Sequence, residues 1–395
     1  MKQKQCRLLS LLMMVLLLTG SGCGQNAAQS NEQGVTLYEE EKYDKALVKF
    51  NQAITQDEQN SQYYTNRGMT YLMLGQYEDA KADFQKSLKI EETMQAHRGL
   101  GILYMNTEAY EDAIAEFDQA VALTGTAVGD LDYDVLAHKA TAQVMRKDYN
   151  GAVDTYSTLI QLKVEISENY LRRGILYLKG GESYLQYTLE DFDSALTAAM
   201  AENTEETSQV YRIYEMIYET LTQYGYDAEA QAYVEQARAL TADGLEEIFQ
   251  RGKLFYALEE YDTAKELFAN ASALGLTDAD YYIAKCAEKQ GDYRSAKEIY
   301  ETLMQQETYQ TAESYNQLGA CLVMLQEYTE AEILFEQALS LDKDGAMEPY
   351  ILWNQAVMYE NQKEYEKAYQ VLLTYEKKYP MGEEEARKLA YLKNR

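Results

Sequence analysis

Proline is nearly missing from this sequence, and a disorder-promoting composition is missing with it. The chain has 395 residues, of which 2 are proline, 22 are glycine and 46% are apolar. Chains that stay unfolded have few apolar residues and many proline and polar residues, so the composition excludes a largely disordered protein. The length disfavours one compact core, whereas an array of repeats escapes that limit because each unit contacts only its neighbours.

Positive charge is also scarce. The 36 Lys and Arg residues face 65 Asp and Glu residues, which gives a formal net charge of -29. Without residues 1–22, which carry three positive charges and no negative ones, the net charge becomes -32. Such an acidic body repels phosphate backbones and anionic headgroups, so no nucleic-acid partner is predicted. The excess is typical of solvated helix faces and also suits a basic partner.

Cysteine is rare, with 4 residues in the chain. Cys6 and Cys23 lie near the N-terminus, and Cys286 and Cys321 occupy equivalent places in neighbouring sequence repeats described below. Equivalent places on stacked helices lie roughly 10 Å apart, which is too far for a disulfide. We expect Cys286 and Cys321 to be buried as small apolar residues.

Catalytic signatures are absent. The patterns GxxxxGK[ST], GxGxxG, HExxH, CxxC and GxSxG do not occur in the sequence. The 2 histidines, His97 and His138, are interpreted as partly buried hydrogen-bonding residues rather than catalysts. Among 65 acidic residues carboxylate pairs arise by chance, so no acid–base pair is inferred. No catalytic residue, metal site or cofactor is predicted.

The N-terminus has the pattern of a secretory signal. Lys2, Lys4 and Arg7 precede an apolar run from Leu8 to Leu18, and small residues follow in "TGSG". The run has 11 residues, whereas a membrane-spanning helix needs about 20. The alternative is a short anchor helix that is not cleaved.

The stretch "LLLTGSGCGQN" resembles the lipobox of bacterial lipoproteins, in which the cysteine carries the lipid. The resemblance implies that Cys23 is lipidated and that residues 1–22 form the signal peptide. It departs from the family pattern at Gly20, where a leucine is usual. More than one acyl chain holds a protein stably on a bilayer. The polar residues 23–32 are then predicted to form a flexible tether.

Most of the remaining chain is a sequence repeat. Residues 41–54 read "EKYDKALVKFNQAI", residues 75–88 read "GQYEDAKADFQKSL" and residues 326–339 read "QEYTEAEILFEQAL". The first two align without gaps at an offset of 34, and their shared residues are spaced 3, 4 and 3 apart. This spacing predicts one buried face of a helix. A second amphipathic helix precedes each stretch, with the turn near Glu41 or Gly75.

Three rows of residues recur along the chain. Alanines of the second helices are Ala46, Ala80, Ala113, Ala152, Ala230, Ala264, Ala296, Ala331 and Ala368, with Thr188 in the same row. Four residues later come Phe50, Phe84, Phe117, Tyr156, Phe192, Val234, Phe268, Tyr300, Phe335 and Leu372. Small residues of the first helices are Gly34, Gly68, Gly101, Ala140, Gly174, Gly252, Ala284, Gly319 and Ala356. Small residues let helices approach closely and large rings fill the space between pairs.

This pattern is similar to the tetratricopeptide repeat family over residues 30–382. The resemblance implies an all-α solenoid of about ten stacked helical hairpins in a right-handed superhelix with a concave groove. We divide the predicted solenoid into two arrays, 33–200 and 201–382, and expect a capping helix over 383–395. The period is disturbed between Gly174 and Phe192, where the spacing is two residues longer, and at Tyr218, which replaces a small residue.

In this family the first helices line the groove. The resemblance places apolar residues there in the N-terminal half, namely Met69, Leu72, Met73, Ile102, Met105, Val144, Met145, Ile175 and Leu178. In the C-terminal half it places polar and aromatic residues, including Tyr256, Tyr281 and Trp353. These residues either bind a partner or are covered by neighbouring helices. Three arginines each precede a small residue, namely Arg67, Arg173 and Arg251. They either bind the carboxylate of a ligand or pair with a nearby Asp or Glu of this chain.

Taken together, the sequence favours a non-enzymatic, lipid-anchored scaffold of the bacterial cell envelope, outside the cytoplasm. Its partner would be another envelope protein or peptide bound in the groove. The alternative is a binding module for a glycan or cell-wall fragment, and an enzyme is the third reading. Fold alone does not decide among them, because function depends on sites.

Overall fold

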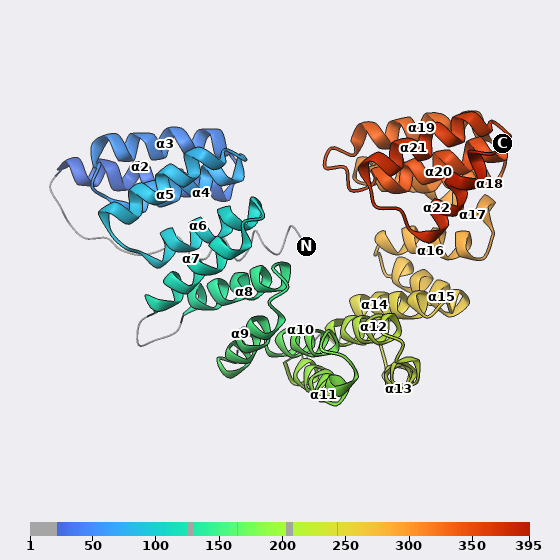
Figure 1. Ribbon diagram of the computed structural model, residues 1–395, viewed down its shortest axis with the longest axis horizontal. Helices are drawn as coiled ribbons and strands as arrows, with labels where there is room; N and C mark the ends of the chain where they lie inside the picture. Colours follow the sequence, from blue (N-terminus) through green and yellow to red (C-terminus); the bar gives the residue numbers. More distant parts are fainter. Residues whose placement is uncertain (1–21, 125–128, 164, 203–207, 243) are drawn as a thin grey trace. The chain divides into compact units, whose positions relative to one another are not determined.

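The computed structural model describes residues 22–124, 129–163, 165–202, 208–242 and 244–395, which form helices joined by turns and loops (Figure 1). The chain divides into two compact units, the first ending at Ala199 and the second beginning at Met200. Within each unit, helical hairpins follow one another along the chain. The prediction of an all-α repeat solenoid is therefore confirmed.

The first unit begins with α2. Its helices are α2 (Gly22–Glu39), α3 (Tyr43–Gln56), α4 (Ser61–Met73), α5 (Tyr77–Ile90), α6 (Met94–Asn106), α7 (Tyr110–Ala122), α8 (Asp130–Met145), α9 (Tyr149–Gln161) and α10 (Ile166–Leu178). A 3₁₀ turn, η1 (Glu182–Tyr184), precedes α11 (Leu185–Glu202). Even-numbered helices are the first helices of their hairpins, and odd-numbered helices are the second.

The second unit continues the same alternation. Its helices are α12 (Ser208–Gln223), α13 (Asp227–Arg238), α14 (Leu245–Ala257), α15 (Tyr261–Ala273), α16 (Asp278–Lys289), α17 (Tyr293–Leu303), α18 (Ala312–Met324), α19 (Tyr328–Leu341), α20 (Glu348–Asn361), α21 (Tyr365–Lys378) and α22 (Glu383–Leu392). A 3₁₀ turn, η2 (Glu307–Tyr309), precedes α18. The predicted capping helix corresponds to α22, which packs on α21.

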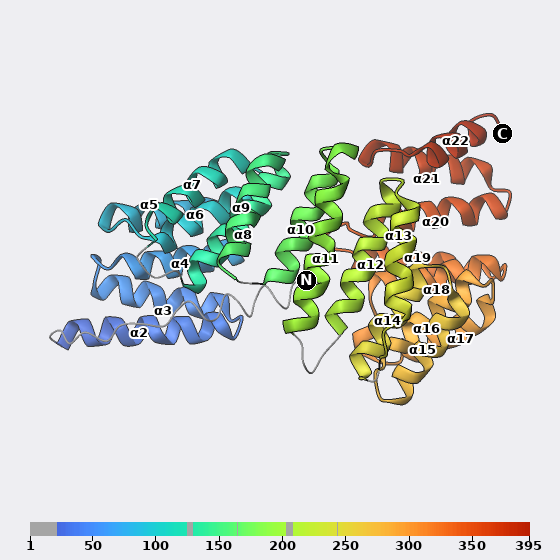
Figure 2. The ribbon, with the colours of Figure 1, turned by 90° about the horizontal axis from the view of Figure 1, so that it is seen from below.

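The repeated residues form the core as their spacing predicts. Ala46, Phe50 and Ala53 of α3 are fully buried, and Ala80 and Phe84 of α5 are buried in the same way. In the first unit α3, α5, α7 and α9 each pack against the first helix of their own hairpin and against the next first helix, as α3 does with α2 and α4 (Figure 2). Each hairpin thus buries its apolar face on two sides, which a single hairpin cannot do.

Where a phenylalanine ring lies between the two helices of a hairpin, the first helix has glycine opposite the ring. A Cβ atom added to Gly68 would lie 2.8 Å from the Phe84 ring, and one added to Gly101 would lie 2.5 Å from the Phe117 ring. Real Cβ atoms do not approach other atoms so closely, so the ring occupies the space that a side chain would need. The small residue of the first helix and the ring of the second helix therefore pack directly against each other.

The turn inside each hairpin contains one residue in the left-handed region. Glu41 has φ 58° and Gly75 has φ 72°, and Lys147, Glu259 and Gln326 occupy the same place in other hairpins with φ between 60° and 66°. This conformation costs a non-glycine residue roughly 1–2 kcal/mol. The predicted turn positions near Glu41 and Gly75 are confirmed, and most hairpins tolerate the cost without glycine.

The prediction of a flexible tether over 23–32 is wrong for the part that the structure describes. Helix α2 runs from Gly22 to Glu39, and Ala27 is fully buried against Ala53 and Tyr63. The helix extends because its small residues pack on α3 and α4, a contact that local polarity does not reveal. The predicted signal peptide, and the side chain of Cys23, lie outside the described residues.

Two further observations concern the predicted cysteines and the membrane. Cys286 and Cys321 are both buried and free, as expected. Among the helices that the structure describes, none combines the length and apolarity needed to span a bilayer.

Candidate functional site

The first helices contact one another directly within each unit. In the first unit α4 touches α6 and α6 touches α8, and in the second unit α18 touches α20. These helices therefore present a shared surface, which we call the first-helix face. The residues predicted from the sequence to bind a partner all belong to these helices.

Three of the predicted apolar residues are not available on this face. Met69 and Leu72 of α4 are 7% and 6% exposed and belong to one apolar cluster with Leu100 and Leu103 of α6. Leu178 of α10 is 2% exposed. The neighbouring hairpin covers Met69 and Leu72, so their part in the predicted groove is corrected to a part in the core.

The other apolar residues of the first unit are partly accessible. Met73 and Met145 are 37% and 53% exposed at the C-terminal ends of α4 and α8. Ile102, Met105 and Ile175 are half-buried. The predicted apolar stripe is therefore interrupted, and its accessible parts lie at helix ends.

Polar contacts join successive first helices in the first unit. Asn66 of α4 donates to Oδ1 of Asn31 in α2 at 2.9 Å. Arg98 of α6 donates from Nε to Asp134 of α8, and both side chains are less than a tenth exposed. Burial alone would raise the pKa of Asp134, but the Arg98 hydrogen bond and the charges of His138 and Arg98 outweigh it and lower the pKa. These contacts fix the spacing of the helices.

In the second unit the first-helix face contains a group of three tyrosines around one lysine. The Lys285 Nζ lies 5.7 Å from the ring centre of Tyr256, 5.5 Å from that of Tyr281 and 5.4 Å from that of Tyr282. Tyr256 belongs to α14, and the other three belong to α16. We call these four residues the tyrosine–lysine cluster. Each ring is at a distance at which its face attracts the ammonium.

The tyrosine–lysine cluster is half-buried, and this changes its acid–base behaviour. Burial, with a smaller effect of nearby Glu215, raises the pKa of Tyr282 to about 12. Burial likewise raises the pKa of Tyr281 and Tyr256. No carboxylate lies within ion-pair distance of Lys285 in the part of the chain that the structure describes. The tyrosines therefore stay protonated at neutral pH beside a cation without a direct counter-ion.

Carboxylates and amides from α16 and α18 surround this cluster. Tyr281 donates from its hydroxyl to Glu313 at 2.7 Å. Gln317 donates from Nε2 to Glu288 at 3.1 Å, and the Cys321 thiol donates to the same carboxylate at 3.4 Å. Burial raises the pKa of Glu288. The result is a polar surface with both donors and acceptors.

Trp353 of α20 is partly covered by the chain itself. It is half-buried, and the Lys388 Nζ of the capping helix α22 lies 5.2 Å from its ring centre. Lys388 also pairs with Glu360. Beside Trp353, Asn354 donates to Asn316 at 3.0 Å, which repeats the contact between Asn66 and Asn31. Lys388 therefore lies over one face of the Trp353 ring.

The sequence analysis missed several residues of this region. Four residues that contact this region were not predicted to bind a partner, namely Tyr282, Glu313, Gln317 and Lys388. Tyr282 contacts Lys285, Glu313 contacts Tyr281, Gln317 contacts Glu288 and Lys388 contacts Trp353. The doublet Tyr281–Tyr282 was a visible signal. The contact of Lys388 with Trp353 had no signal, because it depends on how α22 folds back.

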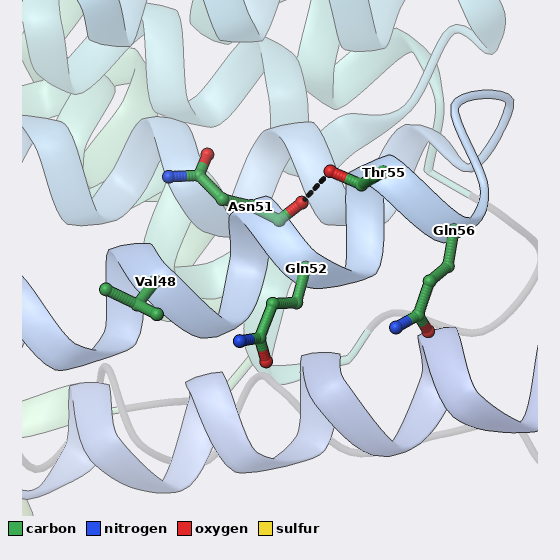
Figure 3. A pocket seen from close by; sticks show the side chains of 5 residues that line it. All are labelled: Val48, Asn51, Gln52, Thr55 and Gln56. Atoms are coloured by element: carbon green, nitrogen blue, oxygen red, sulfur yellow. Dashed lines mark hydrogen bonds between the residues drawn. The ribbon is translucent and has the colours of Figure 1, made fainter.

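The remaining features do not form a chemical site. A shallow depression of about 370 Å³ is lined by Val48, Asn51, Gln52, Thr55 and Gln56 (Figure 3). All five residues come from α3, and none is titratable. Across the described ranges no group of three or more His, Cys, Asp or Glu residues could hold a metal ion.

Comparison with known families identifies the repeat. Models of the tetratricopeptide repeat match residues 61–94, 275–344 and 350–380, and a model described as "TPR repeat" matches residues 34–75. The matched segments fall on hairpins of both units. These segments match the tetratricopeptide repeat, which indicates a scaffold for protein–protein interaction.

Individual proteins resemble only parts of the chain. Sperm-associated antigen 1 of Rattus norvegicus is 38% identical over 60 residues, which are 15% of this chain and 7% of that protein. The solved structure of pilF from Pseudomonas aeruginosa has a TM-score of 0.42 at 14% identity and covers 57% of this chain and 97% of its own. That of YrrB, described as a TPR protein with an unusual peptide-binding site, has a TM-score of 0.36 at 18% identity, covering 43% and 85%. The repeat assignment rests on the family models and on the helix geometry.

Proposed function

We propose that this chain is a non-enzymatic scaffold that binds a protein or peptide on the first-helix face of its second unit. The observation that carries the proposal is the tyrosine–lysine cluster with Glu313 and Gln317 beside it. Tyrosine rings give large contact area at low entropic cost, and they are enriched at protein interfaces. The surrounding amide and carboxylate groups suit the backbone of an extended peptide.

The stacking of hairpins supports this proposal energetically. Tyr256 is supplied by α14, Lys285 by α16 and Gln317 by α18, and each helix is fixed by its own packing. A surface that is ordered before binding loses little conformational freedom when a partner arrives. The exposed Met73 and Met145 of the first unit offer a second, apolar contact region, because methionine adapts to different partners.

Site-specific photo-crosslinking tests the binding surface. A photoreactive amino acid at Tyr281 is expected to crosslink a partner in cells, whereas one at Ile333 is not, because Ile333 lies 52% exposed on the second helix α19. The double variant Tyr256→Ala with Tyr282→Ala should weaken capture by at least tenfold, the order expected for two aromatic contacts. Equal crosslinking from both positions would contradict the proposal.

The proposed location is the bacterial envelope, with Cys23 carrying the lipid. The support is the run from Leu8 to Leu18 followed by small residues and Cys23. Cys23→Ala is expected to release the chain from membranes and to abolish acyl labelling. Unchanged acyl labelling of Cys23→Ala would remove this part of the proposal and leave the binding surface unaffected.

A second candidate function is the binding of a glycan or cell-wall fragment. Tyr177, Tyr184 and Tyr187 form a cluster at η1, with ring centres 5.7 to 6.2 Å apart. Tyr184 and Tyr187 are 44% and 53% exposed, so their faces can stack on a sugar ring. Calorimetry with soluble cell-wall fragments should detect binding that Tyr184→Ala with Tyr187→Ala abolishes and Tyr281→Ala does not. Absence of binding to the unmodified chain would exclude this candidate.

A further inference from the structure

One position of the repeat carries an ion pair in two hairpins of the first unit. Arg67 of α4 donates from Nε and Nη2 to the two carboxylate oxygens of Asp83 in α5, both at 2.6 Å. Arg173 of α10 makes the same bidentate contact with Asp191 of α11, at 2.8 and 2.7 Å. Each arginine precedes the small residue, and each aspartate precedes the large ring. The sequence-based expectation of local pairing is confirmed for these two arginines.

Each of these arginines has a third partner on the preceding hairpin. Nη1 of Arg67 donates to Asn51 at 2.5 Å, and Nη1 of Arg173 donates to Ser157 at 2.9 Å. In both cases the partner lies 16 residues before the arginine. The repeat thus defines a complete site, in which one guanidinium is held by a carboxylate and a neutral acceptor.

Arg251 of α14 has the same place in its hairpin but lacks the carboxylate. It precedes Gly252, and the residue before the ring of Phe268 is Leu267. Leu267 lies 16 residues after Arg251, the same separation as between Arg67 and Asp83. Within the described ranges no carboxylate forms an ion pair with Arg251, and its one hydrogen bond is from Nη2 to the Arg238 carbonyl at 3.5 Å. The expectation of local pairing is wrong for this arginine.

A second arginine lies beside it. The guanidinium carbons of Arg238 and Arg251 lie 5.1 and 5.7 Å from the ring centre of Phe255. Glu260 pairs with Arg238 through both oxygens, and Glu235, which stands where Asn51 and Ser157 stand, is 3.4 Å from the Arg238 Nε. The nearby carboxylates are therefore taken by Arg238, and Arg251 is left without one.

One buried donor in this region has no acceptor. The Nε atom of Arg251 is buried and has no hydrogen-bond partner among the described residues, whereas the Nε of Arg238 has the Glu235 carboxylate at 3.4 Å. An unsatisfied buried donor costs about 1–3 kcal/mol, and more when it is charged. Such conflicts between a residue and its surroundings are expected at functional sites. The unpaired Arg251 beside the Phe255 ring points to an acceptor that comes from another molecule.

We propose that Arg251, assisted by Arg238, binds a carboxylate of an acidic side chain on the partner protein. The carboxylate would give Arg251 the charge partner that Asp83 and Asp191 give to their own arginines and that Leu267 does not provide. The fork of a guanidinium matches the two oxygens of a carboxylate, and the two occupied hairpins show this geometry within the same chain. This inference rests on the proposed function, because the carboxylate belongs to the bound protein.

The site is distinct from the tyrosine–lysine cluster. Arg251 contacts the end of α13, whereas Tyr256 of the same helix α14 contacts Lys285 of α16. A partner that reaches both would cross α14.

Nuclear magnetic resonance of the arginine side chains tests the proposal without the partner. In the purified chain labelled with ¹⁵N-arginine, the Nε–Hε signal of Arg251 is expected to shift and to exchange more slowly with water as sodium acetate is added. The signals of Arg67 and Arg173 should not move, because Asp83 and Asp191 already occupy them. Sodium phosphate and sodium chloride at equal ionic strength provide the comparison.

Two variants separate binding from folding. Leu267→Asp supplies an internal carboxylate, so the Arg251 signal should resemble that of Arg67 without acetate, and the acetate affinity should fall about tenfold or more. Arg251→Leu imitates the apolar pair Leu318–Leu334 of another hairpin and should fold while losing the response. Capture through a crosslinker at Tyr281 tests the proposed function separately.

The outcomes are unambiguous. A saturable acetate response at Arg251 that Leu267→Asp removes supports the proposal. No response at Arg251, an equal response at Arg67, or a response to phosphate alone overturns it. If Leu267→Asp does not fold, the same decision follows from Arg251→Leu, in which the remaining arginine signals must show no acetate response.

Discussion

The two units fill the same repeat position in different ways. In the first unit Arg67 pairs with Asp83 and Arg173 pairs with Asp191, whereas in the second unit Leu318 and Leu334 meet in an apolar cluster. Both solutions keep the small residue and the ring in contact, because Gly68 meets Phe84 and Gly319 meets Phe335 in the same manner. The contact between the small residue and the ring is therefore compatible with either chemistry at the two neighbouring positions.

Energetics explains why matched pairs are interchangeable and mixed pairs are not. A buried ion pair loses hydration energy, and Coulomb attraction and hydrogen bonds offset this loss. Replacement of both residues by apolar ones is therefore often neutral. Removing one partner leaves a charge without compensation. Arg251 opposite Leu267 is a mixed pair. Leu100 opposite Glu116 is also mixed, but Glu116 contacts His97, whereas Arg251 has no carboxylate partner among the described residues.

The largest expected effect comes from making a mixed pair in the first unit. Asp83→Leu leaves Arg67 opposite a leucine and should lower the free energy of unfolding by about 3 kcal/mol. The double variant Arg67→Leu with Asp83→Leu should recover most of that loss. Urea unfolding followed by far-ultraviolet circular dichroism measures both variants.

The single tryptophan provides the control for this experiment. Trp353 lies in the second unit, so its fluorescence should report an unchanged unfolding midpoint in Asp83→Leu. A double variant as unstable as Asp83→Leu would break the comparison, since the ion pair would then have a role that apolar residues cannot replace.

The pH dependence of two buried carboxyl groups sharpens the contrast between units. The pKa of Asp134 is lowered in the folded chain, so its stabilising contribution is present at neutral pH and is lost as the pH falls through the acid range. The pKa of Glu288 is raised by burial, so its contribution is present in acid and is lost as the pH rises. The two groups act on stability with opposite signs.

Asp134→Asn should therefore cost about 3 kcal/mol at neutral pH, because Arg98 loses its partner, and less below pH 4. Glu288→Gln, which resembles the protonated acid, should stabilise at neutral pH, and the gain should vanish in acid. The free energy of unfolding measured at a series of pH values gives both curves. Two curves of the same sign would show that one of the assigned pKa directions is wrong.

The smallest expected effect concerns a position where the two units agree. Gly75 and Gly291 have φ values of 72° and 79°, and a Cβ atom at either would touch nothing. Alanine at each position should cost about 1 kcal/mol through the backbone alone. Asparagine, which tolerates this conformation, should cost less. Unequal losses in thermal unfolding would show that the turns differ between units.

Much of the fold could be predicted because it depends on spacing. The recurrence of Phe50, Phe84 and Phe117 opposite Gly34, Gly68 and Gly101 fixes which helix faces meet, and the structure has these contacts. The accessibility of the predicted site could not be derived in this way. Met69 and Leu72 are on the expected helix but are covered by α6, which depends on how successive first helices approach.

The polar part of the candidate site was predictable in composition but not in arrangement. The sequence placed Tyr256 and Tyr281 on successive first helices, yet only the structure brings them around Lys285. The unmatched Arg251 was visible in the sequence, since Leu267 stands in the column of Asp83 and Asp191. The unmatched arginine could have been found by comparing, hairpin by hairpin, the residue before the small residue with the residue before the ring.

The contact between each glycine and its ring also constrains how such a chain can evolve. Phe84 fills the space above Gly68, and in the same way Phe268 fills the space above Gly252. A duplication or exchange that begins and ends at the same point of two hairpins preserves every glycine opposite a ring. One that begins elsewhere places a side chain where the ring must lie. The gene can therefore lengthen or shorten by whole hairpins, while insertions of other sizes fall in the turns and loops between helices, as the two extra residues between Gly174 and Phe192 do.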